Sequence, residues 1–584
     1  MGTTIQPIVE KVDDNIHALK AFQKIWTENS SEKETDILFQ FPTVYVHNWQ
    51  DSNEYEVYIG ETNNIIQRTM EHYNAGASEE QWQSQLFSHD ASLYIIGHEH
   101  FNKSLTLDIE NRLMHYMMSA ERVRKIHNMR GNPQGRYYPD GEMDAIFQMI
   151  WRKLRKDNKE LFPSESAIRD SAIFKASPLH KLTEKQEEIK SRIIERVFAA
   201  LHTQQGHQLI FVDGEAGTGK TVLNSSTFYE IFVKAEEEKM EPLDCCLMVN
   251  HDEQITVYSQ IAQKLGLTDR YGEVVCKPTA FINRHAENEP IDVAFIDEAH
   301  LLLTQGKQSY RGSNQLEDII KRAKVTVVMF DENQILTTEQ YWESQILDKY
   351  RKLARQQGNY FELTEQLRMR ANEEVMGWLD DFTKRRQISK MPDNRGEYEI
   401  RVFEDPFALE DALHEKASDE AHKLSRMIAT YDWEYNSASS PAGRLSKYWE
   451  VIIGQWHKPW NRELDQELDK KSRKANKSLS WAEQPQTLGE VGSTFTIQGF
   501  DLNYAGVILG PSVKYRNGQV IFDPEASFNK KATRNRTLSD NSKQKFGETL
   551  IQHEVRVLMT RGVEGLYIYA CDDELREALL NAAK

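Results

Sequence analysis

The sequence has few of the features that mark membrane or secreted proteins. Its 584 residues contain no apolar run near the ~20 residues that a membrane-spanning helix needs. Residues 1–10 also lack the basic-then-apolar pattern of a secretory signal. We therefore expect a cytoplasmic chain with no membrane partner.

Cysteine is scarce as well. The sequence holds only Cys245, Cys246, Cys276 and Cys571, and no pair has the Cys-x-x-Cys spacing. This small number and spacing suit free thiols in a cytosolic protein better than zinc ligands or disulfides. Reduced, mostly buried thiols are the expectation.

Positive charge is in short supply. Asp and Glu number 90 against 72 Lys and Arg, for a formal net charge of −18. Such a chain does not coat nucleic acid indiscriminately, although a locally basic groove remains compatible with it. The sequence is also too long for one hydrophobic core, so several domains are expected.

The most informative segment is Leu209–Thr221. The apolar residues Leu209 to Val212 predict a buried strand, and Gly214-x-x-x-x-Gly219-Lys220-Thr221 follows at once. This is the phosphate-loop pattern, in which glycines let backbone N–H groups point inward around an anion. A glycine-rich turn with an incidental Lys-Thr is the plainer alternative, but strand, loop and helix come in the order that the mechanism needs.

Each residue type of this loop suits a nucleoside triphosphate. Gly214, Gly217 and Gly219 free the backbone to curl, and a following helix would direct its positive end at the phosphates. Lys220 supplies a mobile cation and the Thr221 hydroxyl can ligate Mg²⁺. We expect ATP and Mg²⁺ as cofactors.

Further strands are predicted at residues 245–250, 293–296 and 325–330, alternating with helices. Buried strands separated by helices predict a parallel α/β sheet. The 293–296 strand ends in Asp297-Glu298, where Asp297 can hold Mg²⁺ and Glu298 can polarise the attacking water. The 325–330 strand ends in Asp331-Glu-Asn-Gln334, which puts the polar Gln334 beside the γ-phosphate.

From about residue 180 onward the chain resembles superfamily 1 helicases, and among them the DUF2075, schlafen-type group. The resemblance implies that Gln186 recognises adenine. It implies arginine fingers at Arg368, in the segment Leu363–Arg368, and at Arg561, in the segment Val555–Arg561. It also implies that Gln498 and Gly499, in the segment Thr494–Gly499, couple the nucleotide state to the nucleic acid. Two arginines far along the chain make physical sense if a second lobe closes over the nucleotide and neutralises the transferred phosphate. Structural arginines paired with local carboxylates are the alternative.

The N-terminal part carries a second candidate site. Residues 43–46 and 55–60 predict a β-hairpin, residues 63–73 a helix with Arg68 and His72 on one face, and residues 106–122 a helix with Glu110. Residues 1–35 are expected to be helical.

These residues resemble the GIY-YIG nuclease family over about residues 40–135. The match consists of Tyr45, Tyr58-Ile59-Gly60, Arg68, His72, Glu110 and Asn128, with Thr43-Val44 in place of the first Gly-Ile pair. The resemblance implies that Glu110 holds Mg²⁺ or Mn²⁺, that Arg68 binds phosphoryl oxygens, and that Tyr45 or Tyr58, with a lowered pKa, helps to deprotonate water. Packing tyrosines and a surface Arg–Glu pair are the alternative.

The expected fold class is therefore α/β multidomain: a small GIY-YIG domain followed by two RecA-like parallel-sheet lobes. The expected boundaries are a helical segment over 1–35, the nuclease-like domain over 36–135, a linker with a basic helix over 136–180, the first lobe over 181–358, and the second over 359–584 with an irregular insertion at about 404–486. Basic runs at 470–477 and 530–536 are candidates either for a single-stranded nucleic-acid path or for solvated loops.

The leading functional hypothesis is an ATP-dependent DNA translocase or helicase joined to an endonuclease, in defence against foreign DNA or in DNA processing. Nucleic acid, with DNA expected, is the main partner; a second copy of the chain and a defence-system protein stay open as further partners. One alternative is a nucleotide-gated switch that recruits a partner without moving along nucleic acid. Another keeps the ATPase but makes the N-terminal domain a passive DNA grip.

Overall fold

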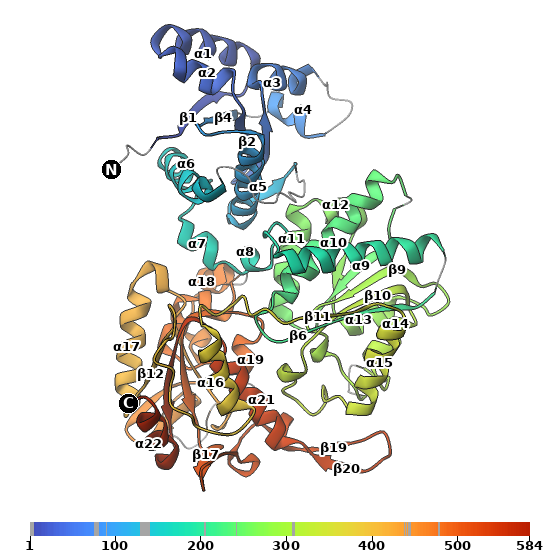
Figure 1. The fold of residues 1–584 in the computed structure, drawn as a ribbon, viewed down its shortest axis with the longest axis vertical. Coiled ribbons are helices and arrows are strands. Elements are labelled where there is room, and N and C mark those ends of the chain that lie inside the picture. Colours follow the sequence, from blue (N-terminus) through green and yellow to red (C-terminus); the bar gives the residue numbers. More distant parts are fainter. Residues whose placement is uncertain are drawn as a thin grey trace. The chain divides into compact units, whose positions relative to one another are not determined.

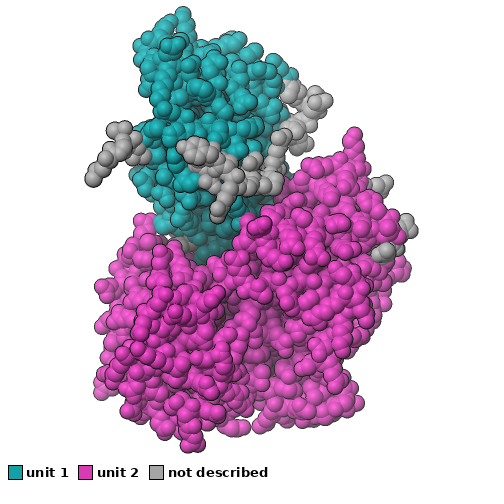
Figure 2. All heavy atoms as spheres, in the orientation of Figure 1, with its two compact units in different colours: residues 1–181, 257–274 teal, residues 182–256, 275–584 magenta. Residues whose placement is uncertain are grey.

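The computed structural model divides the chain into two compact units (Figure 2). Unit 1 contains residues 1–181 and 257–274, and unit 2 contains residues 182–256 and 275–584. The structure describes residues 5–74, 81–88, 90–128, 140–203, 206–240, 242–306, 310–436, 439, 441, 446–476 and 479–584. Within this part of the chain, no helix combines the length and the apolar character that crossing a bilayer requires.

Unit 1 is built on a five-stranded sheet of order β1-β4-β2-β3-β5, antiparallel except for the β3–β5 pair (Figure 1). Its strands are β1 (Ile8–Asp13), β2 (Thr43–Asp51), β3 (Glu54–Thr62), β4 (Ala91–Gly97) and β5 (Val123–Ile126). The predicted hairpin is confirmed, since β2 and β3 pair in a register that sets Tyr45 opposite Gly60. The predicted helices are α3 (Ile65–Asn74) and α5 (Lys103–Ser119).

Two predictions for unit 1 are wrong in part. Residues 1–35 are not all helical, because β1 pairs along its length with β4 before α1 (Ile16–Asn29) begins. The basic helix predicted in a linker is α6 (Met143–Asp157), which buries Phe147, Trp151 and Leu154 within unit 1. Its apolar stripe packs and only the opposite face is basic, as expected for an amphipathic helix. The Gly-Asn-Pro-Gln-Gly motif at residues 131–135, which by its composition predicts a domain boundary, lies outside the described residues.

Unit 2 carries two parallel sheets, which confirms the predicted α/β class. We call the part with the six-stranded sheet, of order β11-β6-β10-β9-β7-β8, the first lobe. The part from α16 (Glu373–Thr383) onward, with the four-stranded sheet of order β12-β21-β16-β13, is the second lobe. All pairings within these two sheets are parallel.

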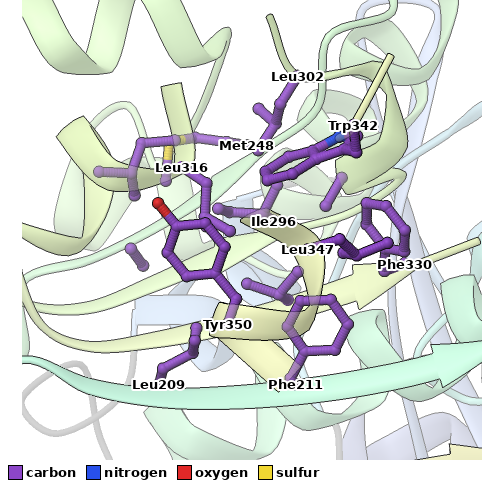
Figure 3. Close-up of a cluster of buried hydrophobic side chains, with 14 of the residues drawn as sticks. Leu209, Phe211, Met248, Ile296, Leu302, Leu316, Phe330, Trp342, Leu347 and Tyr350 are labelled. Atoms are coloured by element: carbon purple, nitrogen blue, oxygen red, sulfur yellow. The ribbon is translucent and has the colours of Figure 1, made fainter. Parts of the chain in front are cut away.

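The strands of the first lobe are β6 (Gln208–Gly214), β7 (Cys245–Met248), β8 (Val275–Cys276), β9 (Ile291–Ile296), β10 (Ala323–Phe330) and β11 (Tyr360–Leu363). Because β11 pairs with β6, this sheet continues past the boundary expected at residue 358. Figure 3 shows side chains of its core, including Leu209, Phe211 and Phe330, which are fully buried. This apolar layer fixes the strand whose end becomes the phosphate loop.

The strands of the second lobe are β12 (Glu399–Val402), β13 (Arg426–Ala429), β16 (Leu502–Leu509) and β21 (Gly562–Ala570). The region 404–486, predicted as an irregular insertion, is irregular only in part. It contains α17 (Pro406–Ser418) and β13, a fully buried strand that pairs with β16. Beyond β13 the chain forms a small hairpin, β14 (Glu450–Ile453) with β15 (Trp456–Pro459), and short helices.

Candidate functional site

The predicted nucleotide residues follow the carboxyl ends of three neighbouring strands of the first lobe. The phosphate loop follows β6, Asp331 follows β10, and Asp297 and Glu298 follow β9. Parallel strands end at one edge of a sheet, so residues from three separate segments gather there. The sheet order thus supplies the arrangement that the sequence pattern only suggested.

The phosphate loop needs its glycines for two separate reasons. Gly217 and Gly219 have φ values of +86° and +78°, in the region that favours glycine. A Cβ atom on Gly219 would also lie 2.2 Å from Nε2 of Gln186. The loop then leads into α10 (Lys220–Glu237), whose N-terminus carries the Lys220 and Thr221 side chains. A curled backbone at a helix N-terminus is suited to an anion.

Lys220 is buried and held against the loop. Its Nζ atom donates to the carbonyl oxygens of Gly214 (2.7 Å) and Glu215 (2.8 Å) and lies 3.6 Å from Oδ2 of Asp331. Burial by itself would raise the pKa of Asp331, but Lys220 and hydrogen bonds from its neighbours keep that pKa below its ordinary value. A cation, a glycine cradle, the Thr221 hydroxyl and nearby carboxylates fit a magnesium-bound triphosphate, in which the metal would neutralise phosphate charge.

Glu298 has an unusual backbone. Its φ and ψ are both 48°, a left-handed conformation that few residues other than glycine adopt, and its side chain is buried. Oε2 of Glu298 lies 3.5 Å from Nδ1 of His300, whose pKa is lowered by burial. Strained conformations of this kind concentrate at functional sites, which supports the role predicted for Glu298.

The second lobe contributes a buried arginine. Arg561 donates from Nη2 to Oε1 of Gln334 at 2.8 Å and from Nη1 to the Phe500 carbonyl at 3.3 Å. Gln334 in turn donates to Asp331 at 2.8 Å, so hydrogen bonds link Arg561 to the carboxylate beside Lys220. Burial, and then the nearby positive charge of Arg368, lower the pKa of Arg561 to about 10. Its Nε atom has no hydrogen-bond partner in the described chain.

Of the other predicted helicase residues, Gln498 joins this network directly, and Arg368 lies close enough to Arg561 to affect its pKa. Arg368 pairs through Nε with Oδ1 of Asp501 at 2.6 Å. The Gln498 amide nitrogen donates to the Gln334 carbonyl at 3.3 Å and lies 3.4 Å from Nε2 of His300. Gly499, with φ +87°, sits so close to Gln254 that a Cβ atom would lie 2.4 Å from its amide nitrogen. Predicted residues from four separate segments, 331–334, 363–368, 494–499 and 555–561, are therefore brought close to one another.

Gln186 lies at the loop but is already engaged. Its Oε1 accepts from the Thr183 backbone N–H at 3.0 Å, and its Nε2 donates to the Thr218 carbonyl at 3.1 Å. The first bond completes a capping box at the start of α9 (Glu184–His202). In this structure Gln186 ties that helix to the phosphate loop; adenine recognition by it stays a prediction.

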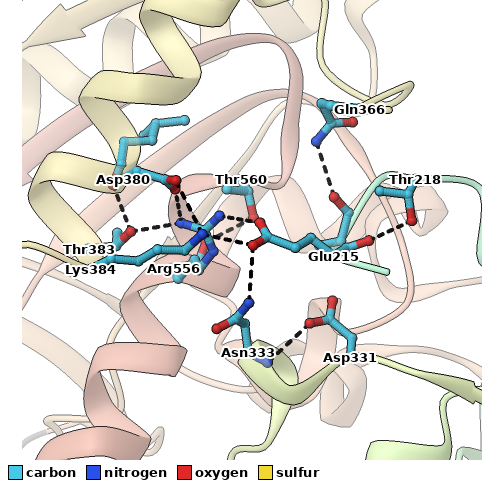
Figure 4. Close-up of polar contacts among 12 residues, drawn as sticks. Glu215, Thr218, Asp331, Asn333, Gln366, Asp380, Thr383, Lys384, Arg556 and Thr560 are labelled. Carbon is cyan, nitrogen blue, oxygen red and sulfur yellow. Dashed lines mark hydrogen bonds and ion pairs between the residues drawn. The ribbon is translucent and has the colours of Figure 1, made fainter. Parts of the chain in front are cut away.

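An ion network that the sequence did not predict surrounds the same loop (Figure 4). Glu215, one residue after Gly214, binds Arg556 of α21 (Gly547–Met559) at 2.5 Å and Lys384 at 2.7 Å. Arg556 also binds Asp380 at 2.6 Å. A cavity of about 1050 Å³ opens beside this loop, lined among others by Gly214, Glu215 and Thr218. Only the position of Arg556 inside the Val555–Arg561 segment could have pointed to it.

In unit 1 the nuclease-like residues also gather. Tyr45 on β2 lies 3.0 Å from Nε2 of His72 on α3, and its ring crosses Gly60, where a Cβ atom would lie 2.5 Å from it. Tyr58 stacks on Trp82, with ring centroids 4.1 Å apart. On α5, the largely buried Glu110 accepts from Nδ2 of Asn128 at 3.2 Å. Arg68 is 3.3 Å from Glu71 on its own helix.

One prediction about this cluster is wrong. Burial raises the pKa of both Tyr45 and Tyr58 instead of lowering it. Among the described residues there is also no group of three or more His, Cys, Asp or Glu side chains that could hold a metal. Glu110 alone still fits a magnesium ion that takes its other ligands from water and phosphate, as such ions commonly do.

Sequence reasoning also missed a buried pair behind the tyrosines. Nδ1 of His47, on β2, lies 2.6 Å from Oδ2 of Asp14, and both side chains are fully buried. Tyr73 donates to the other Asp14 oxygen. Asp14 follows β1, the strand that was predicted as helix, so no pattern in the sequence indicated that these residues meet.

The two basic runs behave differently from each other. In the 470–477 run, α18 (Lys470–Ala475) has no buried residue, and Lys477 lies outside the described residues. In the 530–536 run, Arg536 is buried and donates to the carbonyls of Thr338 (2.5 Å) and Thr304 (3.3 Å) of the first lobe. Arg534 pairs with Glu339. Both arginines therefore bind the first lobe, Arg536 as a buried side chain and Arg534 as an exposed one.

Comparison with known proteins agrees with this geometry. The family described as Schlafen group 3, DNA/RNA helicase domain, matches residues 207–572. A Saccharomyces cerevisiae relative, the uncharacterized protein YPL245W, is 31% identical over 443 residues, which cover 69% of this chain and 91% of the relative. The match to the family runs from the start of β6 to the end of β21 and includes the phosphate loop and both predicted arginine fingers.

Two solved structures are similar at low sequence identity. One, of Pif1 helicases described in DNA unwinding at forked double-stranded DNA, is 11% identical, covers 67% of this chain and 92% of its own, and has a TM-score of 0.26. The other, Pif1 helicase from Candida albicans, is 12% identical, covers 68% and 97%, and has a TM-score of 0.26. On the family match, which spans more than half of its residues, this chain belongs to the Schlafen group 3 DNA/RNA helicase domain family.

Proposed function

We propose that unit 2 is an ATP-driven nucleic-acid motor of the superfamily 1 helicase type, built from two RecA-like lobes that bind ATP and Mg²⁺. The observation that carries this is a path that runs from Lys220 by an ion pair to Asp331, and from there by hydrogen bonds through Gln334 to Arg561. It joins the phosphate-binding lysine of one lobe to an arginine of the other. Such an arrangement lets phosphate charge control how the lobes close.

Each residue has a defined part in this proposal. Lys220 and the loop backbone hold the phosphates, Thr221 and Asp297 hold the metal, and Glu298 orients the attacking water. Arg561 and Arg368 stabilise charge that develops as the phosphoryl group transfers. Gln498, placed between His300 and the Gln334 backbone, transmits the state of that site to the nucleic-acid side of the second lobe.

The test is the ATPase rate of the full chain alone, with single-stranded DNA, and with double-stranded DNA. A motor should be stimulated strongly by one of these polynucleotides. A rate that no polynucleotide changes would favour the rival interpretation, a nucleotide-gated switch that recruits a partner without translocating. An absence of ATP consumption in every condition would refute the motor, and an absence of nucleotide binding as well would refute both.

For unit 1 we propose a metal-dependent phosphodiester endonuclease of the GIY-YIG type, fed by the motor in defence or DNA processing. The support is the convergence of Tyr45, His72, Tyr58, Glu110 and Asn128 from four elements and the segment after β5. Because the tyrosine pKa values are raised, we assign proton transfer to a tyrosine only as a hydrogen-bond relay toward His72. Cleavage of plasmid and forked DNA by the wild type, lost in Glu110→Ala, would separate this nuclease from a passive DNA grip.

A further inference from the structure

The phosphate loop of this chain carries a carboxylate where its ligand would bring negative charge. Glu215 is the residue directly after Gly214, and its side chain is 46% exposed. Its two oxygens are both occupied by cations of the second lobe: Oε2 by Nη2 of Arg556 at 2.5 Å, and Oε1 by Nζ of Lys384 at 2.7 Å. Figure 4 shows Glu215 pointing from the loop toward these two side chains.

The cations are held in place independently of Glu215. The Arg556 side chain is only 8% exposed, and its Nη1 donates to Oδ1 of Asp380 at 2.6 Å and to Oγ1 of Thr383 at 2.9 Å. Lys384 follows α16 and lies 3.2 Å from the other oxygen of Asp380. Asp380 thus orients both cations and Thr383 also holds Arg556, which leaves one guanidinium nitrogen and the ammonium group directed at the loop.

Two preorganised cations beside a phosphate loop form an anion site, and here a side chain of the loop itself fills it. Guanidinium and ammonium groups bind carboxylate and phosphate through the same contacts. A triphosphate carries more negative charge than a carboxylate, so it competes well for them. The Glu215 carboxylate would meanwhile repel the phosphates, because it lies on the loop that binds them.

We propose that Arg556 and Lys384 form a binding site for a terminal phosphate of the nucleotide, and that Glu215 occupies this site until nucleotide displaces it. This proposal rests on the proposed function, because it needs the loop to bind a nucleoside triphosphate. Glu215 is then an internal competitor that weakens nucleotide binding. Its displacement also frees the loop from the second lobe, so nucleotide arrival changes the contact between the lobes.

A purely structural role for the network makes the opposite prediction. If the ion pairs of Glu215 only hold the loop in the conformation that binds nucleotide, removing the charge of Glu215 should loosen the loop and weaken nucleotide binding. If Glu215 is a competitor, Glu215→Gln should strengthen nucleotide binding, since the amide keeps the size of the side chain but loses its charge. The direction of the change therefore distinguishes the two roles.

The experiment measures the dissociation constant of a fluorescent ATP analogue with Mg²⁺ for the full chain. Glu373→Gln is the matched control: Glu373 is exposed, lines the same cavity, and has no ion pair with Arg556 or Lys384 in the described chain. We expect Glu215→Gln to bind about fivefold to tenfold more tightly than the wild type, the range of a moderate ion-pair coupling. Glu373→Gln should stay within about twofold of the wild type.

A second variant guards against an indirect effect of Glu215→Gln. The double variant Glu215→Gln/Arg556→Gln lacks the guanidinium group of the proposed site, so the gain in affinity should disappear. The double variant Glu215→Gln/Arg556→Lys keeps a cation there and should keep part of the gain. If Glu215→Gln binds the ATP analogue as tightly as the wild type does, or more weakly, the competitor role of Glu215 is overturned while the proposed function is not. If no variant binds nucleotide while all melt cooperatively, the proposed function itself fails.

Discussion

At the scale of single residues, burial decides what the charged groups of unit 2 can do. Arg561 has no exposed surface, and its guanidinium is held by Gln334 and the Phe500 carbonyl. If Arg561 is the arginine finger that we propose, truncating it removes an interaction made mainly as charge develops on the phosphate. The neighbouring Lys220 instead contacts the loop that holds the ligand in the ground state.

Arg561→Ala should therefore spare ATP binding and slow hydrolysis by a factor of about 10³, the lower end of the range for arginine fingers. Nucleotide affinity and single-turnover hydrolysis are the two measurements. A variant that loses affinity and hydrolysis in equal measure would show that Arg561 acts in binding.

A second residue-scale prediction concerns Glu554 of α21. Burial, and then the charge of Asp432, raise the pKa of Glu554 to about 8. The folded state thus binds a proton that the unfolded state loses near its ordinary pKa, so stability falls as pH rises between that value and about 8. We expect the melting temperature of the wild type to fall more than that of Glu554→Gln between pH 5 and pH 8.5. Parallel pH profiles for the two proteins would contradict this.

The individual glycines and the phosphate loop could be predicted at this scale, because their roles depend on neighbours in sequence. The Glu215–Arg556 and Asp14–His47 pairs could not, since each joins residues far apart in the chain. The same holds for the tyrosine pKa values, which burial sets and which no sequence pattern indicates.

At the scale of elements, β6 is the support of the nucleotide site. Phe211 is fully buried in the core between β10, β11 and α15 (Ser344–Gln356), and the loop begins three residues later. In this sheet, the sequence predicts best those strands that coincide with longer runs of apolar residues. Short β8 and β11 were missed, because two to four residues carry little periodicity.

Phe211→Ala should lower the free energy of unfolding of unit 2 by about 3–5 kcal/mol, the cost of removing a large buried ring. Denaturant unfolding followed by tryptophan fluorescence measures it. The exposed Phe407 on α17 is the control, since Phe407→Ala removes a ring that is 51% exposed and should cost much less. Equal losses for both variants would mean that β6 is not a stability determinant.

Helix boundaries and partners were predicted unevenly. The helix with Arg68 and His72 and the helix with Glu110 appear close to where the pattern put them. Residues 8–13 became a strand because an open edge of β4 satisfies their backbone groups, a long-range contact that outweighs local preference.

At the scale of the whole molecule, two compact units share one chain, and each carries one candidate site. If both proposals hold, the sites can be silenced separately. Lys220→Ala should abolish ATP turnover and leave only the DNA cleavage that the wild type shows without ATP. Glu110→Ala should abolish cleavage and keep polynucleotide-stimulated ATP hydrolysis. Cleavage of Lys220→Ala that still responds to added ATP would show that the units are not coupled as proposed.

The sequence by itself determined the nucleotide-binding loop, the parallel α/β class and the order of the helicase segments, because these depend on short-range spacing and on apolar runs that must be buried. Only the tertiary structure decided which charges meet: that Arg561 reaches Gln334, that Glu215 is bound by Arg556 and Lys384, and that β1 completes the sheet of unit 1. The physical reason is that such contacts depend on how strands order themselves within a sheet and on which side chains lose water, and neither is encoded by neighbours in the chain.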